Sequence, residues 1–100
     1  MKKDIFMQYV SHISRKYEIT PKQLLTKSKK PEFTLPRHIL YYLSYHRNMS
    51  IGMIRQFLRE NGYESAARPI RYGIDRVQRL LDEDPDYGVL LKKIDSWVVV

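Results

Sequence analysis

The segment SAARPIRYGIDRVQRLLDED, residues 65–84, carries two periodic patterns at once. Its apolar residues recur at intervals of three and four: Ile70, Ile74, Val77 and Leu81. Its arginines are Arg68, Arg71, Arg76 and Arg79. At about 100° per residue, the apolar positions form one stripe of a helix and the arginines lie largely on the other side. The segment therefore predicts a helix that begins between Ser65 and Arg68, has Pro69 in its first turn and exposes four guanidinium groups.

The residues just before this segment predict another helix and a tight turn. Ser50 can cap a helix whose inward side is formed by Ile51, Ile54 and Leu58. Asn61-Gly62 supplies the left-handed residue that ends it. This order matches a helix-turn-helix unit, in which a short helix, a turn with glycine and a second helix follow one another. The second helix of such a unit enters the major groove of DNA.

The remaining chain predicts four more helices. Phe6, Tyr9, Val10, Ile13 and Tyr17 place an amphipathic helix over residues 4–17, opened by Asp4. A short helix follows, with Thr20 as its cap, Pro21 as its first residue and Leu24-Leu25 inward. Residues 27–34, KSKKPEFT, lack periodicity and predict an exposed basic loop.

A long helix is predicted to begin at residues 34–36, since Pro36 suits a first turn, and to end at HRNMS. The last helix has Asp84 as its cap, Pro85 as its first residue and Leu90, Leu91 and Ile94 as its apolar side. The terminal WVVV fits either an extended tail or a packed helix end. We therefore expect an all-α fold, a compact bundle of about six helices forming one domain over residues 1–100.

The charge distribution favours a polyanionic partner. The net charge is +7, with 16 lysines and arginines against 6 acidic residues in positions 1–79, and 2 against 5 in positions 80–100. Nucleic acid is the most common partner of such a chain, and anionic lipid or an acidic protein are the other options. The chain has no cysteine and no run of eighteen apolar residues, so we expect a soluble protein with no membrane association, in the cytoplasm and associated with the nucleoid.

Candidate DNA contacts divide into two groups. For base edges in the major groove we expect Arg68, Arg71, Tyr72 and Arg76. For backbone phosphates we expect Lys27, Lys29, Lys30, Arg37 and Arg55. The alternative for the arginine row is a solvated face supported by Asp75 and Arg79 at i, i+4 spacing.

Other residues suggest no catalytic or metal chemistry. His12, His38 and His46 have no carboxylate at ligand spacing, so we expect no metal, no cofactor and no enzyme activity. His38, near the basic loop, is expected either to touch phosphate or to lie exposed. Three tyrosines at helical spacing, Tyr41, Tyr42 and Tyr45, are expected to pack in the core and at its rim.

Residues 4–95 resemble the C-terminal DNA-binding domain of the bacterial replication initiator DnaA. The resemblance rests on the basic run after Leu24-Leu25, on PRHILYYL at residues 36–43 and on NMSI at residues 48–51. It implies an all-helical domain with a helix-turn-helix that binds short duplex boxes. Arg37 then matches the basic residue that opens the long helix, and residues 66–79 match the recognition helix.

The departures from that family concern the base-reading residues. The family has Asp-His-Thr-Thr at the start of the recognition helix, where this chain has Ala66, Ala67, Arg68 and Pro69, and about four extra residues precede it. The family's minor-groove arginine aligns with Pro31, and no nucleotide-binding loop motif is present. The target sequence is therefore not transferable, and initiation, repression and other DNA transactions remain open.

Two functions follow from the sequence. The first is a double-stranded DNA-binding protein serving replication initiation or transcription regulation. The alternative is an initiator-like interaction protein that binds an acidic partner and modulates replication or transcription. The sequence leaves the oligomeric state open.

Overall fold

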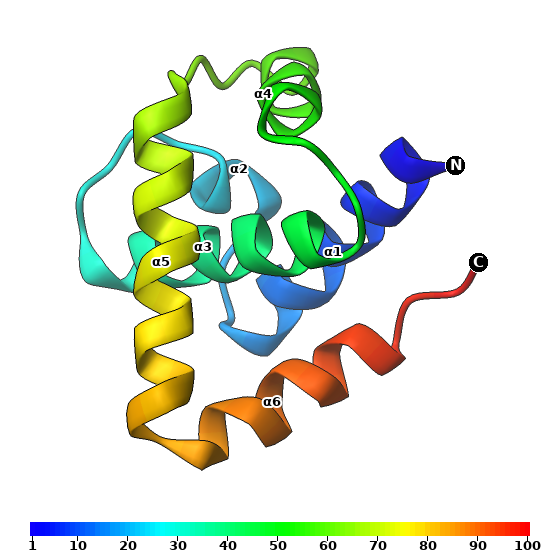
Figure 1. The fold of residues 1–100 in the computed structure, drawn as a ribbon. Helices are drawn as coiled ribbons and strands as arrows, with labels where there is room; N and C mark the ends of the chain where they lie inside the picture. The colour runs from blue at the N-terminus through cyan, green and yellow to red at the C-terminus, as the bar shows by residue number, and fades with distance from the viewer.

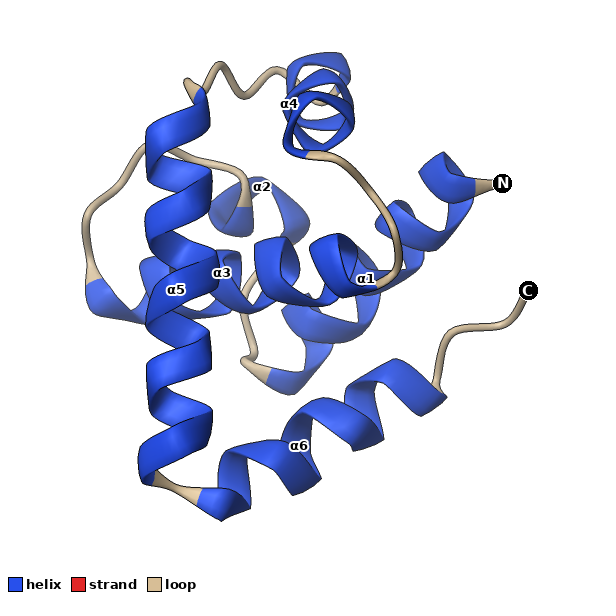
Figure 2. Ribbon diagram, in the orientation of Figure 1, coloured by secondary structure: helices blue, strands red, loops and turns tan.

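Six helices and no strand make up residues 1–100 in the computed structural model (Figure 2). The helices are α1 (Lys2–Lys16), α2 (Pro21–Leu24), α3 (Pro31–His46), α4 (Ile51–Glu60), α5 (Ala67–Glu83) and α6 (Pro85–Ser96). The predicted all-α bundle of six helices is confirmed. None of these helices is both long enough and apolar enough to cross a membrane.

Helix α3 is the centre of the bundle. In Figure 1, α5 runs across the near side of α3 while α1 lies on its far side. The packing of α3 against α5 is the most extensive between any two helices, and that of α3 against α1 is next. Buried residues occur on several sides of α3, among them Ile39, Leu40, Tyr41 and Leu43. A helix buried on several sides lies between layers, and α3 therefore sets the separation of α1 and α5.

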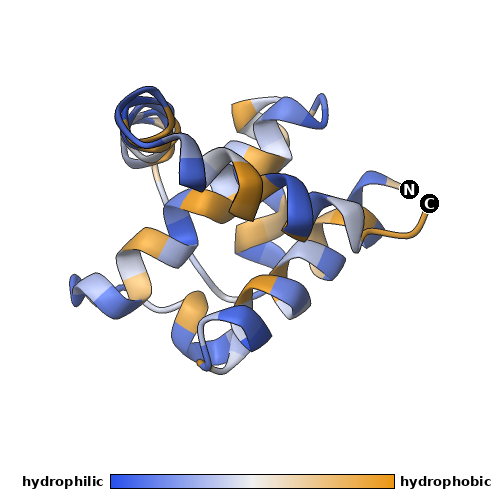
Figure 3. Ribbon diagram, turned by 90° about the horizontal axis from the view of Figure 1, so that it is seen from below, coloured by the Kyte–Doolittle hydropathy of each residue, from blue (hydrophilic) through white to orange (hydrophobic).

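The hydrophobic core is one cluster of 20 buried residues. Figure 3 shows hydrophobic and hydrophilic residues alternating along the helices. Helix α5 contributes Ile70, Ile74 and Val77, and Leu81 is partly buried against the same cluster. The predicted apolar stripe of residues 70–81 is thus confirmed.

Gly73 allows α5 to approach α3 closely. A Cβ atom at this position would lie 2.7 Å from His38 Cδ2, 2.9 Å from His38 Cγ and 3.0 Å from Tyr41 Cδ2. Carbon atoms in van der Waals contact are separated by about 3.5–4.0 Å. The crossing of the two helices therefore requires a residue without a side chain at this point.

The predicted helix boundaries at four positions are confirmed. Thr20 forms a capping box with Gln23, and its side chain accepts from Gln23 N at 3.0 Å. Ser50 accepts from Met53 N at 3.1 Å, and Asp84 accepts from Asp86 N at 3.0 Å. Gly62 has φ +82°, the left-handed conformation that ends α4.

Two predicted helix starts are wrong. Helix α3 begins at Pro31 instead of residues 34–36, so Pro36 lies inside the helix and the basic loop is shorter than predicted. Pro36 has no N–H to donate, so the carbonyl of Glu32, four residues earlier, lacks its helical hydrogen bond. Glu32 is exposed, so water can reach it. Helix α1 begins at Lys2, with Met1 as its cap position, so Asp4 lies in the first turn and does not open the helix.

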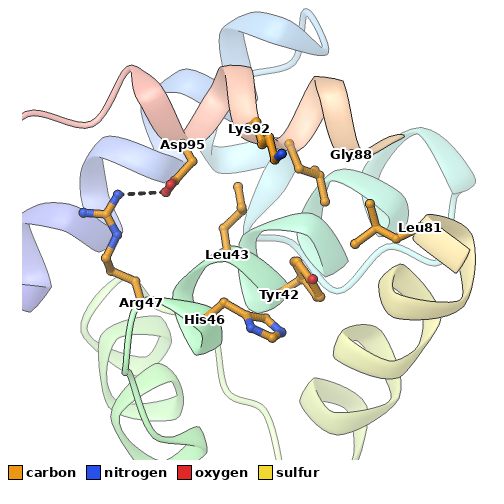
Figure 4. A pocket seen from close by; sticks show the side chains of 9 residues that line it. Tyr42, Leu43, His46, Arg47, Leu81, Gly88, Lys92 and Asp95 are labelled. Atoms are coloured by element: carbon orange, nitrogen blue, oxygen red, sulfur yellow. Dashed lines mark hydrogen bonds and ion pairs between the residues drawn. The ribbon is translucent and has the colours of Figure 1, made fainter. Parts of the chain in front are cut away.

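The C-terminal helix buries Leu91 and Ile94 in the core, and polar contacts attach its end and the tail that follows. Asp95 accepts from Arg47 Nη2 at 2.8 Å, shown by the dashed line in Figure 4, and also from the hydroxyl of Tyr9. Burial, followed by the Asp95 carboxylate, raises the pKa of Tyr9, which keeps its hydroxyl a donor. The tail after Trp97 is extended, and Val99 exchanges two hydrogen bonds with Gln8, both 2.7 Å.

Candidate nucleic-acid interface

The outer row of α5 is exposed and cationic. It consists of Arg68, Arg71, Tyr72, Asp75 and Arg79. The protein contains three ion pairs, Lys3–Glu60, Arg47–Asp95 and Arg59–Glu64, and none of them involves α5. The i, i+4 pair expected from Asp75 and Arg79 is not formed, and the Arg79 guanidinium lies 6.0 Å from the ring centre of Tyr72 instead. The outward guanidinium groups are therefore not neutralised by carboxylates of the protein.

Arg76 points toward α3 and not directly outward. Its Nη1 atom lies 3.2 Å from Nδ1 of His38, and both side chains are half-buried. The expectation that His38 lies exposed is wrong, because α5 covers it. Burial, followed by the nearby Arg76 and Arg37, lowers the pKa of His38 to about 4. Since arginine can only donate, the neutral imidazole accepts at Nδ1 and carries its proton on Nε2.

Arg37 is buried, contrary to the expectation that it contacts phosphate. It is 4% exposed. Its Nε donates to the carbonyl of Leu24 at 2.8 Å, and its Nη atoms donate to the carbonyls of Thr26 and Ser28. The guanidinium also lies 5.2 Å from the ring centre of Tyr63. Arg37 therefore holds the loop between α2 and α3 from the inside.

The three loop lysines lie on the segment that Arg37 holds. Lys27, Lys29 and Lys30 are all exposed, and none forms an ion pair. Since Arg37 ties down the backbone at residues 24, 26 and 28, the lysines are mounted on a short segment with limited freedom.

The turn from α4 to α5, residues 61–66, is braced by two arginines of α4. Arg55 Nε donates to the carbonyl of Ser65 at 2.9 Å, and Arg59 Nε donates to Glu64 at 3.1 Å. Arg55 is half-buried, so its expected role on phosphate needs correction: one of its donors serves the turn. Tyr63, 8% exposed, packs into the core from the same turn. At six residues, this turn is longer than the three to four residues usual in a helix-turn-helix.

The basic loop and the first turn of α5 face the same cleft. Lys27 and Lys29 line it from the loop, and Pro69 lines it from the first turn of α5. The turn before α5 adds Glu64, Ser65 and Ala66. The structure thus brings two of the three loop lysines next to the helix that carries Arg68 and Arg71. The contribution of Tyr63 and Ser65 was missed, and the only sequence signal for it is an aromatic residue directly after Asn61-Gly62.

A second cavity lies between α3, α5 and α6 (Figure 4). Tyr42, His46, Leu81 and Asp95 are among its lining residues, and Asp95 is already bonded to Arg47. No three histidines or carboxylates of the protein are grouped so that they could hold a metal ion. The predicted tyrosine positions are confirmed, with Tyr41 buried and Tyr45 at the rim.

Comparisons with protein-family models, with curated proteins and with solved structures found no match to this chain.

Proposed function

We propose that this protein binds double-stranded DNA, with the N-terminal half of α5 in the major groove and the basic loop on the flanking backbone. The observation that carries the proposal is the set of exposed cations without carboxylate partners on the outer row of α5 and on the neighbouring basic loop. Arg68, Arg71 and Tyr72 would face base edges, and Lys27, Lys29 and Lys30 would face phosphates.

The geometry supports this assignment in two ways. Arg68 and Arg71 are exposed in the first turns of α5, the part of a recognition helix that reaches base edges. The opposite side of the same helix is fixed on α3 through Ile70, Gly73 and Ile74. A rigidly mounted helix loses little conformational entropy when its outer row contacts a partner.

The resemblance to the initiator's DNA-binding domain gives the proposal its biological setting, replication initiation or transcription regulation. The corrected residues change which side chains take part. Arg37 and Arg55 would act by holding the loop and the turn in place, and Arg76 would act from the side of the row while bonded to His38.

The test begins with selection of bound duplexes from a random pool, followed by anisotropy measurements on the selected and a scrambled duplex. Arg71→Ala should weaken binding to the selected duplex by roughly 1–3 kcal/mol and reduce the preference over the scrambled one. Lys29→Ala should weaken both duplexes alike and reduce the salt slope by about one. Equal binding of both duplexes by wild type and Arg71→Ala would rule out base reading by α5.

A second candidate is a protein interface with an acidic partner. The observation in its favour is that Tyr45 and Tyr72, 45% and 57% exposed, lie on the outside of the bundle, and tyrosine and arginine are enriched in such interfaces. Binding of random duplex at low salt separates the two. A DNA-binding protein should bind it with roughly micromolar affinity, and an acidic-partner protein should not.

A further inference from the structure

A second cationic cleft lies on the side of α3 that faces away from α5. Its lining residues are His12, Arg15 and Lys16 of α1, and Trp97 at the end of α6. Its volume of about 500 Å³ is within the usual range for small-ligand sites. Arg15 and Lys16 are exposed, and His12 and Trp97 are half-buried.

The polar groups of this cleft are not used by the rest of the protein, while Trp97 is partly buried against the hydrophobic core. None of the four takes part in the three ion pairs, and none of their side-chain nitrogens has a hydrogen-bond partner in the protein. The rings of His12 and Trp97 lie side by side, with their centres 5.7 Å apart. An indole therefore lies beside two unpaired cations in a cleft with room for a ligand.

Trp97 is held in place from both sides along the chain. Two residues before it, Asp95 is bonded to Arg47 and to Tyr9. Two residues after it, Val99 is bonded twice to Gln8 of α1. The position of the indole against α1 is thus set before any ligand arrives, which lowers the entropic cost of binding.

We propose that this cleft binds an unpaired nucleotide of a single-stranded nucleic acid, with the base stacked on Trp97 and the backbone phosphates on Arg15 and Lys16. Aromatic side chains next to cations are the combination that single-stranded nucleic acids require, since every base offers a face for stacking. A duplex keeps its base faces stacked inside, so it does not fit the indole. An acidic peptide would satisfy the cations without using the aromatic ring.

This site is separate from the duplex-binding surface and does not depend on it. Helix α3 lies between α1 and α5 (Figure 1), so a strand on the α1 side leaves the outer row of α5 accessible. The protein would then be able to hold a duplex and an unpaired strand at the same time.

The single tryptophan makes the test direct. Trp97 is the only tryptophan of the chain, so its emission reports on this cleft alone. A short oligothymidylate should quench the emission in a saturable manner, because stacking brings a base onto the indole. A strand of equal length without bases should bind about tenfold more weakly.

Variants separate the charge contribution from the stacking contribution. Arg15→Ala with Lys16→Ala should weaken oligothymidylate binding about tenfold, and Arg15→Lys with Lys16→Arg should restore it. Lys29→Ala with Lys30→Ala removes the same charge from the other side of α3 and should leave the quenching unchanged. Anisotropy with a labelled strand should give a loss of about tenfold for Trp97→Ala and a smaller loss for Trp97→Phe, with circular dichroism as the check on folding.

The outcomes are distinguishable from those for duplex binding. Arg68→Ala with Arg71→Ala should weaken duplex binding and remove the preference for the selected duplex, and it should keep the quenching by oligothymidylate. Absence of saturable quenching, with duplex binding intact, would overturn the single-strand site and leave the proposed function standing. Equal affinity for the strand without bases, or for an acidic peptide, would reduce the cleft to a simple anion site and also overturn the inference.

Discussion

Replacing Gly73 by alanine tests the crossing of α3 and α5 on which the position of the arginine row depends. The new Cβ would lie 2.7 and 2.9 Å from two ring atoms of His38 and 3.0 Å from a ring atom of Tyr41. These are ring carbons near the start of short, packed side chains, so the neighbours cannot rotate away as a flexible chain end would. We expect an overpacking cost of about 2–3 kcal/mol.

The alanine also favours the helix more than glycine does, and this gain in stability offsets part of the overpacking cost. Glycine inside a helix is about 1 kcal/mol less favourable than alanine. The net loss in the free energy of unfolding should therefore be about 1–2 kcal/mol, or a fall in Tm of roughly 4–16 °C for a domain of this size. Urea unfolding followed by circular dichroism measures the first quantity and a thermal scan the second.

Gly52 provides the matched control. A Cβ at Gly52 of α4 meets nothing closer than Ser50 Oγ at 3.9 Å. Gly52→Ala should thus keep only the helix-forming gain and stabilise the protein by up to about 1 kcal/mol. If Gly73→Ala were as stable as Gly52→Ala, the close crossing of α3 and α5 would be refuted, and with it the placement of the outer row.

Three further predictions concern the residues behind the cationic surface. Because the folded pKa of His38 is about 4 against an ordinary 6.5, its contribution to stability should be complete above pH 6.5 and decline as the pH falls toward 4. Because solvent screens this half-exposed site, the free energy of unfolding should change by only ~1–2 kcal/mol over that pH range. In His38→Asn this part of the pH dependence, measured by urea unfolding, should be absent. Arg37→Met should lower the free energy of unfolding by about 1–3 kcal/mol and speed hydrogen exchange in the basic loop. Arg37→Lys should not restore slow exchange, since one ammonium cannot bond three separated carbonyls. Unchanged exchange in Arg37→Met would contradict the anchoring role. Ser50→Ala should cost ~1 kcal/mol through loss of the α4 cap, measured by urea unfolding, and a neutral result would contradict the cap.

The helices could be predicted from the sequence where local signals and tertiary packing agree. The caps at Thr20, Ser50 and Asp84 act through bonds to residues two or three positions away, so their effect can be read along the chain. The stripe from Ile70 to Val77 has the helical period, which already implies one buried side. Both kinds of signal were therefore sufficient without knowledge of the fold.

The start of α3 could not be predicted because packing overrides a local rule there. Pro36 fits a first helical turn when considered alone, and Pro31 does so equally well. The choice between them depends on burial of Pro36 against the rest of the protein, while Glu32, which loses a bond, remains in contact with water. Neither condition is visible in the sequence.

The roles of Arg37 and His38 were hidden for a related reason. Their partners are the carbonyls of residues 24, 26 and 28 and the guanidinium of Arg76, which are brought near only by folding. Charge in a basic segment suggested exposure for both. The exposure of the loop lysines and of Arg68, Arg71 and Arg79 was predicted correctly, because no carboxylate of the fold pairs with them, whereas Arg76 is drawn toward His38.

The division of α5 into an inner row fixed on α3 and an exposed outer row without ion pairs makes the helix suitable for combinatorial redesign. Randomising positions 68, 71 and 75 changes only exposed side chains, so a library at these sites should retain a folded scaffold in most of its members. Tyr72 is kept, because its ring centre lies 5.8 Å from that of His38 on α3. Within one helix of 17 residues, the outer row can therefore vary in sequence while the inner row must stay constant.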